Sequence, residues 1–214
     1  MRVCALVGAA DFNREHFCNQ HFDYVIAVDG GYMHLQQLEV EPDMVIGDFD
    51  SLAFVPDHPH IKSYPSRKDK VDMELAFDEV RAKGFDLVLM YGCLGGRFDL
   101  SFTTYQLLAH FSHDSEMVYA IGLDTVACVL NANTHPQICF SEHAKGILSM
   151  FALSPELRGV DEIGLEYTLD KATLSNERPL GVSNAFAAQI SKISIQSGIA
   201  LLFFPTEAFQ EILR

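Results

Sequence analysis

The feature that most constrains this chain is a change of pattern near residue 122. Before it, short β-branched runs alternate with helical patterns, and the strand candidates are residues 3–7, 24–28, 44–46, 61–64, 87–91 and 117–120. After it the long helical stripes disappear, and short β-rich runs follow one another, separated by Gly, Pro and Asn. These runs are TVACVLN, PQICFS, GILSMFAL, GLEYTL, AAQISKISIQSG and IALLFFP. Alternating strands and helices are typical of an α/β layer with a mostly parallel sheet. We therefore predict a Rossmann-like α/β domain over residues 1–122 and an all-β sandwich or roll over residues 123–214.

Two helices are predicted in the first part, over residues 71–84 and 99–111. The first carries a rough apolar stripe that begins at Val71, and Gly84 is a suitable residue to follow its last turn. The second places Leu100, Tyr105, Leu108 and Phe111 in a similar stripe. The last residues, TEAFQEILR, are predicted to form a closing helical turn or a tail.

Charge and cysteine usage exclude several classes of protein. The chain has 214 residues and a net charge of −14, from 29 acidic and 15 basic residues, which argues against a nucleic-acid binder. Such a charge favours solubility and is compatible with metal ions or a cationic small molecule. No apolar run approaches the roughly 20 residues that a membrane span needs, and the start is too short in apolar residues for a secretory signal. Five scattered cysteines without a CxxC pair indicate free thiols, and hence a cytoplasmic location.

Unusual residues gather where four successive predicted strands end. They are Asp29, Gly30 and Gly31, then Asp48 and Asp50, then Asp69 and Asp72, and finally Gly95, Gly96, Arg97 and Asp99. A turn, a helix cap or a surface ion pair explains any one of these groups. Four in succession are harder to explain in this way. Because ligands of parallel α/β sheets bind beyond the carboxyl ends of the strands, the recurrence indicates a binding site there.

The residue types at this edge suit a metal-dependent reaction on a nucleotide polyphosphate. Mg²⁺ is typically held by one or two carboxylates together with substrate phosphates. Asp48 and Asp50 can converge on one ion if the segment between them remains extended, with Phe49 directed into the core. Glycine pairs let backbone N–H groups approach phosphate, and an arginine offers it a planar fork. There is no GxxxxGK[ST] motif and no GxGxxG after the first strand, so a P-loop kinase and a dinucleotide-binding protein are not expected.

Several motifs resemble those of the thiamine pyrophosphokinase (thiamin diphosphokinase) family. VDGG, PDMVIGDFDSL, KDKVDME and GGRFDLS occur in that family's order and approximate spacing, and GLEYTL and GVSNAF resemble its C-terminal thiamine-binding β domain. The resemblance runs from about residue 24 to residue 204 and implies a Mg²⁺-dependent transfer of a pyrophosphoryl group from ATP to the hydroxyl of thiamine, which releases AMP. It also implies a homodimer with the active site between the subunits, and no nucleic-acid or membrane partner.

The resemblance assigns a role to each matched residue. Asp48, Asp50 and Asp72 would hold Mg²⁺. Asp29, Gly30, Gly31, Asp69, Gly95, Gly96, Arg97 and Asp99 would surround the polyphosphate and the reacting hydroxyl, with Asp72 or Asp99 as the acceptor of the hydroxyl proton. Tyr167, Ser183 and Asn184 would lie beside thiamine.

The chain departs from the family pattern at three positions. Val71 stands where the family usually has Thr, and Leu100 stands where many members have His. Tyr167 replaces a Trp on which some members stack thiamine, and an aromatic face of tyrosine still attracts the thiazolium cation. Three alternatives stay open at this point: a pyrophosphokinase for another alcohol such as a hydroxymethylpterin, an aspartate-nucleophile phosphohydrolase, and a non-catalytic thiamine- or nucleotide-binding protein. The phosphohydrolase is disfavoured because its DxD motif would follow the first strand directly.

Overall fold

The computed structural model describes residues 1–50, 52 and 54–213. The chain divides into two compact units. The first comprises Met1–Thr104 and Ala120–Leu123, and the second comprises Tyr105–Tyr119 and Asp124–Arg214. Helix α4 (Phe98–Phe111) and strand β6 (Met117–Ile121) each contribute residues to both units.

The first unit is built on a parallel sheet. Its strands lie in the order β5-β1-β2-β3-β4 and have these bounds: β1 Val3–Val7, β2 Tyr24–Val28, β3 Met44–Gly47, β4 Ile61–Ser63 and β5 Leu87–Tyr91. The pairings β1–β2, β1–β5, β2–β3 and β3–β4 are all parallel. All side chains of β3 and β5 are buried, as expected for strands covered on both faces. The predicted parallel α/β layer is confirmed.

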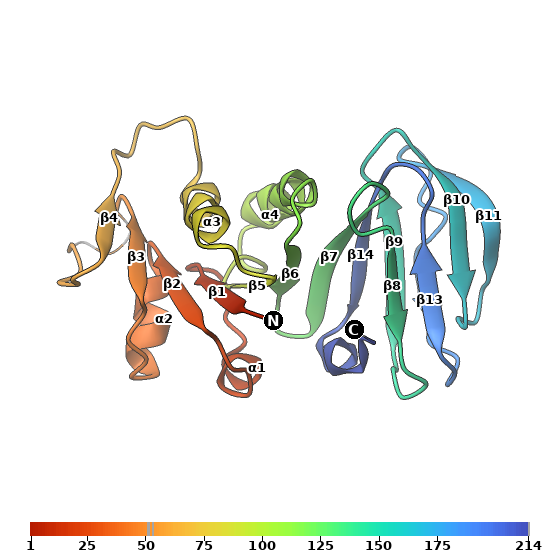
Figure 1. Ribbon diagram of the computed structural model, residues 1–214, viewed down its shortest axis with the longest axis horizontal. Coiled ribbons are helices and arrows are strands. Elements are labelled where there is room, and N and C mark those ends of the chain that lie inside the picture. The colour runs from red at the N-terminus through yellow and green to blue at the C-terminus, as the bar shows by residue number, and fades with distance from the viewer. Residues whose placement is uncertain (51, 53, 214) are drawn as a thin grey trace. The chain divides into compact units, whose positions relative to one another are not determined.

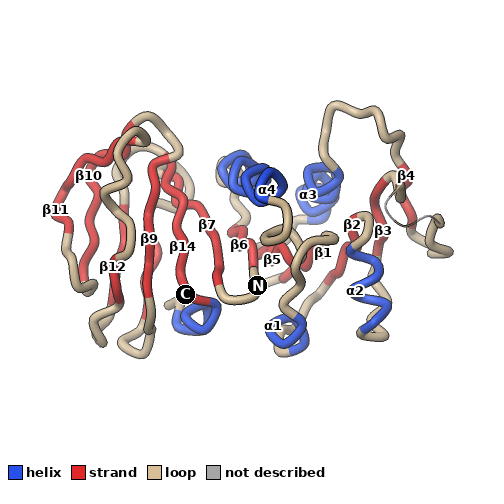
Figure 2. The backbone as a smooth tube through the Cα atoms, turned by 180° about the vertical axis from the view of Figure 1, so that it is seen from behind, coloured by secondary structure: helices blue, strands red, loops and turns tan. Residues whose placement is uncertain are grey.

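Helices cover both faces of this sheet. Figures 1 and 2 place α1 (Arg14–Cys18) and α2 (Gly31–Gln37) on one side of the strands and α3 (Asp72–Lys83) on the other. Helix α3 buries Ala76, Phe77 and Val80 and ends before Gly84, which adopts the left-handed conformation with φ 66° as predicted. Val71 is not part of the buried stripe, because it is the residue before the helix and is 44% exposed.

The second unit consists mainly of antiparallel strands, as the pattern after residue 122 predicts. One set lies in the order β12-β9-β14-β7 and the other in the order β11-β10-β13-β8. The strands are β7 Thr125–Asn131, β8 Gln137–Phe140, β9 Ile147–Ala152, β10 Glu156–Ile163, β11 Leu169–Ser175, β12 Asn184–Ala185, β13 Ser191–Ser194 and β14 Ile199–Pro205. Their inward side chains form an apolar core that includes Phe140, Leu148, Leu202 and Phe204.

One detail of this unit differs from the sequence-based expectation. The run GLEYTL is largely a connection between β10 and β11 rather than a strand, because Gly164 has a φ of 76° and a close approach to Ile190 that end the strand. The last residues form a closing helical turn, the first of the two predicted alternatives, as the 3-10 helix η1 (Thr206–Glu211).

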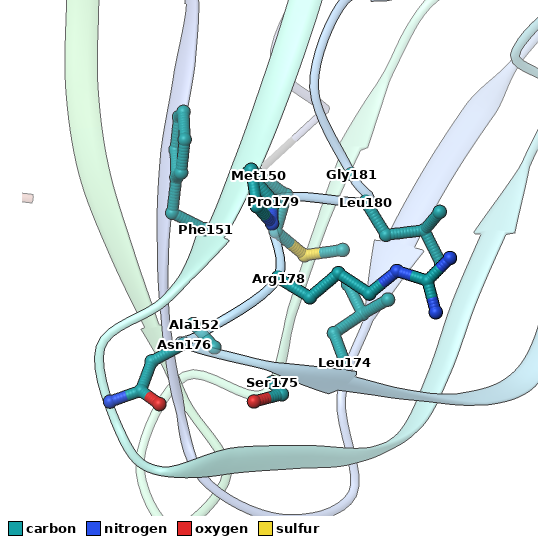
Figure 3. A pocket seen from close by; sticks show the side chains of 10 residues that line it. All are labelled: Met150, Phe151, Ala152, Leu174, Ser175, Asn176, Arg178, Pro179, Leu180 and Gly181. Carbon is teal, nitrogen blue, oxygen red and sulfur yellow. The ribbon is translucent and has the colours of Figure 1, made fainter.

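The residues that the structure describes include no helix suited to span a membrane. None of their helices is both long and apolar enough to cross a membrane. Figure 3 shows a cavity of about 30 Å³ beside Met150, Leu174, Arg178 and Leu180, which has room for no more than one or two water molecules. It is therefore too small to hold a nucleotide or a thiamine.

Gly31 begins α2 at a very close approach to β1. A Cβ atom on Gly31 would lie 1.8 Å from the carbonyl oxygen of Val7, and this oxygen belongs to the backbone of a central strand that cannot give way. The sequence suggested that Gly31 contacts phosphate, but packing of the helix against the sheet already requires glycine here.

We predict that Gly31→Ala lowers the free energy of unfolding by about 3 kcal/mol, the cost of forcing an atom into a packed site. Urea denaturation followed by circular dichroism measures the change. Gly84→Ala is the matched control, because its Cβ would meet nothing within 4 Å and only the left-handed backbone opposes it, which costs about 1–2 kcal/mol. Equal losses in the two variants would contradict the packing explanation.

Candidate active site

Asp29 organises the carboxyl ends of β2 and β3. It follows β2 in the left-handed conformation with φ 48°, and its Oδ1 accepts hydrogen bonds from the backbone N–H groups of Asp48 and Phe49, at 3.1 and 3.2 Å. A Cβ on Gly47 would lie 2.0 Å from that same Oδ1. Gly47 therefore leaves the space that the Asp29 carboxylate occupies, and Asp29 fixes the loop after β3.

The segment between the two aspartates of GDFDS is not extended, although an extended segment was the condition under which the sequence predicted that they converge. Phe49 adopts a left-handed conformation, φ 61°, and is buried, so the segment turns instead of remaining extended. Asp48 Oδ1 accepts from the backbone N–H of Asp50 at 3.2 Å, while Asp50 Oδ2 accepts from the hydroxyl of Ser66 at 2.7 Å. The burial of Phe49 is confirmed, but it comes with a turn, and the two carboxylates have different hydrogen-bond partners. Ser51 of the same motif lies outside the described residues.

Lys68 joins Asp48 to Asp72. Its Nζ lies 3.0 Å from Asp48 Oδ2 and 3.0 Å from Asp72 Oδ1, and the lysine side chain is only 13% exposed. Burial alone would lower the pKa of Lys68, but the two carboxylates outweigh it and raise that pKa. The hydrogen bond from Lys68 in turn lowers the pKa of Asp48. An ammonium group thus lies between two of the three predicted metal ligands.

Asp29 is the acid of this group whose charged form is disfavoured. Burial, followed by the neighbouring Asp72 carboxylate, raises the pKa of Asp29 to about 6, although the N–H of Phe49 opposes the shift. Lys68 therefore does not fully neutralise the negative charge at this edge. We call Asp29, Asp48, Lys68 and Asp72 the carboxylate cluster.

The GGRFD loop lies at the end of β5 and the start of α4. Gly95 and Gly96 have φ values of 84° and 64°, and a Cβ on Gly95 would lie 2.1 Å from Asp11 Oδ2, so glycine is required there. Arg97 donates through Nε and Nη2 to the two oxygens of Asp99, at 3.1 and 2.5 Å. Both side chains are mostly exposed, so this pair is available to solvent and to ligands.

Of the remaining predicted residues in this unit, Gly30 is the residue before α2 and Asp69 is exposed in the loop before α3.

The site residues of the second unit lie on and near β12. Tyr167 is 70% exposed, Ser183 donates its backbone N–H to Ser149 Oγ at 3.0 Å, and Asn184 is buried. Ser149 also lines an open hollow of about 400 Å³ together with Asp124, Ile147 and Phe203, a volume in the range of small-ligand sites.

Sequence reasoning missed Lys68, the residue that connects the cluster. The signal was present in SRKDKVD, where Lys68 precedes Asp72 by four residues, the spacing at which helical neighbours meet. Among residues 1–50, 52 and 54–213, no three His, Cys, Asp or Glu side chains are arranged to hold a metal ion. In the cluster, the carboxylates of Asp48 and Asp72 instead flank the ammonium group of Lys68, and Asp29 is the neighbouring third acid.

Comparison with known proteins shows which family the chain resembles. Residues 16–120 match the family model described as thiamin pyrophosphokinase, catalytic domain. The thiamine pyrophosphokinase of Bacillus subtilis (strain 168) is 22% identical over 196 residues, which cover 85% of this chain and 87% of that protein.

Solved structures share the whole fold. The crystal structure of thiamine pyrophosphokinase from Bacillus subtilis has a TM-score of 0.83 at 21% identity and covers 96% of this chain and 99% of its own. That of thiamin pyrophosphokinase from Geobacillus thermodenitrificans has a TM-score of 0.79 at 22% identity, with 95% and 97% covered. The enzyme from Candida albicans has a TM-score of 0.70 at 15% identity, with 95% and 89% covered.

The fold therefore places this chain in a class of proteins that join a parallel α/β unit to an antiparallel β unit. The match to the catalytic-domain model covers β2 to β6, including all four groups of predicted α/β site residues. The chain belongs to the thiamine pyrophosphokinase family, a family of transferases in thiamine diphosphate biosynthesis.

We predict that Asp29→Asn stabilises the metal-free protein at neutral pH while it impairs activity. An amide oxygen still accepts from the N–H groups of Asp48 and Phe49, but no charge is buried. The raised pKa of Asp29 destabilises the folded state as the pH rises through about 6 and has no effect below its ordinary value of 3.8, where folded and unfolded chains are both protonated. Because the group is partly exposed, we expect a gain of only about 1 kcal/mol.

Thermal unfolding in EDTA at about pH 4 and about pH 7.5 measures this difference. The variant should unfold at a higher temperature than the wild type at the higher pH and at the same temperature at the lower pH. Glu15→Gln, in the first turn of α1, serves as a control for the loss of one carboxylate elsewhere in the unit. A gain that is independent of pH would contradict the explanation.

Proposed function

We propose that this chain is a cytoplasmic, Mg²⁺-dependent thiamine diphosphokinase that transfers the pyrophosphoryl group of ATP to the hydroxyl of thiamine and releases AMP. The observation that carries the proposal is the carboxylate cluster. In it, Asp48 and Asp72 both contact the ammonium group of Lys68, beyond the carboxyl ends of parallel strands. Ligands of this fold class bind at that edge.

The residues present fit a divalent cation. The carboxylates of Asp48 and Asp72 each lie 3.0 Å from the Lys68 ammonium nitrogen. Nearby, the pKa of Asp29 is raised. Oxygen donors of this kind suit Mg²⁺. We propose Asp48 and Asp72 as its ligands, with Asp50 as the third after its carboxylate leaves Ser66. When bound, Mg²⁺ would neutralise charge on the phosphate oxygens.

The chain's own residues would position the polyphosphate. Gly30, Gly31, Gly95 and Gly96 would bring backbone close to phosphate, and Asp69 would lie nearby. Arg97 would exchange its contact with Asp99 for phosphate oxygens, since its fork binds both groups in the same way. Asp99, once released, or Asp72 would accept the proton of the thiamine hydroxyl as it attacks the β-phosphorus. Orientation and charge neutralisation would supply most of the rate.

We propose that residues 1–122 form the catalytic, ATP-binding domain and that residues 123–214 form the thiamine-binding domain. Tyr167 offers an exposed aromatic face to the thiazolium cation, and Ser183 lies beside the hollow that Ser149 lines. We also propose a homodimer with the active site at the subunit interface. In its support, the second unit exposes large apolar side chains such as Ile147, Ile163, Leu180 and Ile190.

We predict that incubation with ATP, Mg²⁺ and thiamine yields thiamine diphosphate and AMP in equal amounts, as measured by chromatography. Asp72→Asn should reduce turnover by at least about a thousandfold, because electrostatic stabilisation at phosphate is worth several kcal/mol. Glu74→Gln, on the same first turn of α3, is the control for folding.

Other products would favour other functions. ADP with thiamine monophosphate would indicate a simple kinase. Turnover with a hydroxymethylpterin but not with thiamine would indicate the related pyrophosphokinase. Binding of thiamine or nucleotide without any product would indicate a non-catalytic binding protein.

Lys68 gives a second test that does not depend on activity. We predict that Lys68→Met binds Mn²⁺ or Mg²⁺ about tenfold more tightly than the wild type when no nucleotide is present, because the cation no longer competes with an ammonium group at 3.0 Å. Isothermal titration calorimetry on EDTA-stripped protein measures the affinity. Lys70→Met is the matched control, because Lys70 contacts Glu74 and Asp78 on the helix surface instead. Weaker binding in Lys68→Met would mean that the carboxylates need the lysine to stay together.

A further inference from the structure

Asn184 has no hydrogen-bonding capacity left for a ligand. Its Oδ1 accepts from the backbone N–H groups of Tyr167 and Ala185, both at 2.9 Å, and its Nδ2 donates to the carbonyl of Tyr167 at 2.6 Å and to Glu162 Oε2 at 2.7 Å. These four bonds use both donors and both acceptor positions of the amide. The side chain is 4% exposed. Asn184 therefore holds the backbone of Tyr167 on both sides instead of facing thiamine.

Glu162 is the anchor of this arrangement. It lies on β10, where Leu157 and Val160 also direct their side chains inward, and it is 1% exposed. From there it reaches Asn184 on β12, which belongs to the other set of strands, so a single hydrogen bond joins the two sets across the interior of the unit.

A carboxylate at this position has an energetic cost. Burial raises the pKa of Glu162, and the bond from Asn184 offsets only part of that shift. Its second oxygen, Oε1, has no hydrogen-bond partner among the residues that the structure describes. An apolar residue would complete the core at lower cost, and local violations of this kind concentrate at functional sites.

Through Asn184, Glu162 is connected to the backbone of Tyr167, whose ring is exposed. The connection from Gly164 to Thr168 pairs with the β12 segment through the bridge between Leu165 and Phe186 and the bond from Glu166 N to Ala185 O. Among residues 1–50, 52 and 54–213, only the side chain of Asn184 extends that pairing to Tyr167 itself. Without a fixed amide orientation at Asn184, the backbone of Tyr167 would lose both of these hydrogen bonds.

We propose that Glu162 is a positioning residue of the thiamine site, which acts through Asn184 to hold the loop that presents Tyr167. This inference rests on the proposed function, since it assigns thiamine as the ligand of the tyrosine ring. Glu162 itself does not touch the substrate. It fixes the amide so that Oδ1 faces two N–H donors and Nδ2 faces two acceptors, and the opposite orientation would place donors against donors.

The test compares Glu162→Leu with Glu162→Gln. Leucine fills the buried space without an acceptor, whereas glutamine keeps an oxygen for Asn184 Nδ2. We expect Glu162→Leu to raise the thiamine KM about tenfold with the ATP KM unchanged, the effect of one lost charge-assisted hydrogen bond. Hydrogen exchange of the Tyr167 amide should become at least about tenfold faster, while the amides of β14 exchange as before. Glu162→Gln should restore both quantities to within about threefold of the wild type.

Other results would overturn the proposal. Glu162 would be a merely structural residue if Glu162→Leu left the thiamine KM unchanged or raised both KM values equally. The same would follow if Glu162→Gln were as impaired as Glu162→Leu. If Glu162→Leu does not fold, Asn184→Ala takes its place with the same expected split between thiamine and ATP. If the wild-type chain turns over no thiamine, the proposed function is overturned. If the wild type is active but the Glu162 variants do not change the thiamine KM separately from the ATP KM, only the role of Glu162 is overturned.

Discussion

Repulsion between carboxylates at the edge of a parallel sheet is the constraint on which the rest of this structure depends. Three acids, Asp29, Asp48 and Asp72, are delivered to one place by β2, β3 and the start of α3. Lys68 separates two of them, and backbone N–H groups partly satisfy the third. Burial raises the pKa of Asp29, and the neighbouring Asp72 carboxylate raises it further. A site of this kind is prepared for additional positive charge, which is what a metal-dependent phosphoryl transfer requires.

The second unit holds the backbone of the exposed Tyr167 by hydrogen bonds. It does so with a buried polar connection from Glu162 through Asn184 to the backbone of Tyr167. The two units thus use charge in opposite ways. The α/β unit keeps like charges close together near its surface, whereas the β unit buries a single carboxylate to orient an amide.

Much of the fold was predictable because periodicity and turn chemistry are local properties. The parallel strands, helix α3 with its glycine end and the β-rich second part follow from patterns that a window of a few residues contains. Strand β10 and the loop after it did not follow, because the bulges opposite β11 and the close contact of Gly164 with Ile190 depend on residues far away in the sequence. The packing role of Gly31 likewise depends on Val7, a residue of another strand.

The sequence by itself determined which residues gather at the carboxyl ends of the strands, because the order of strands and helices decides where each loop emerges. It also carried the motifs that place the chain in its family. Only the tertiary structure decided how these side chains pair. Phe49 adopts a left-handed turn between Asp48 and Asp50, and Lys68 lies between Asp48 and Asp72. Asn184 uses its amide group to bond to Tyr167 and Glu162. Such pairings depend on distances of about 3 Å between segments that are remote in sequence, and no local pattern encodes them.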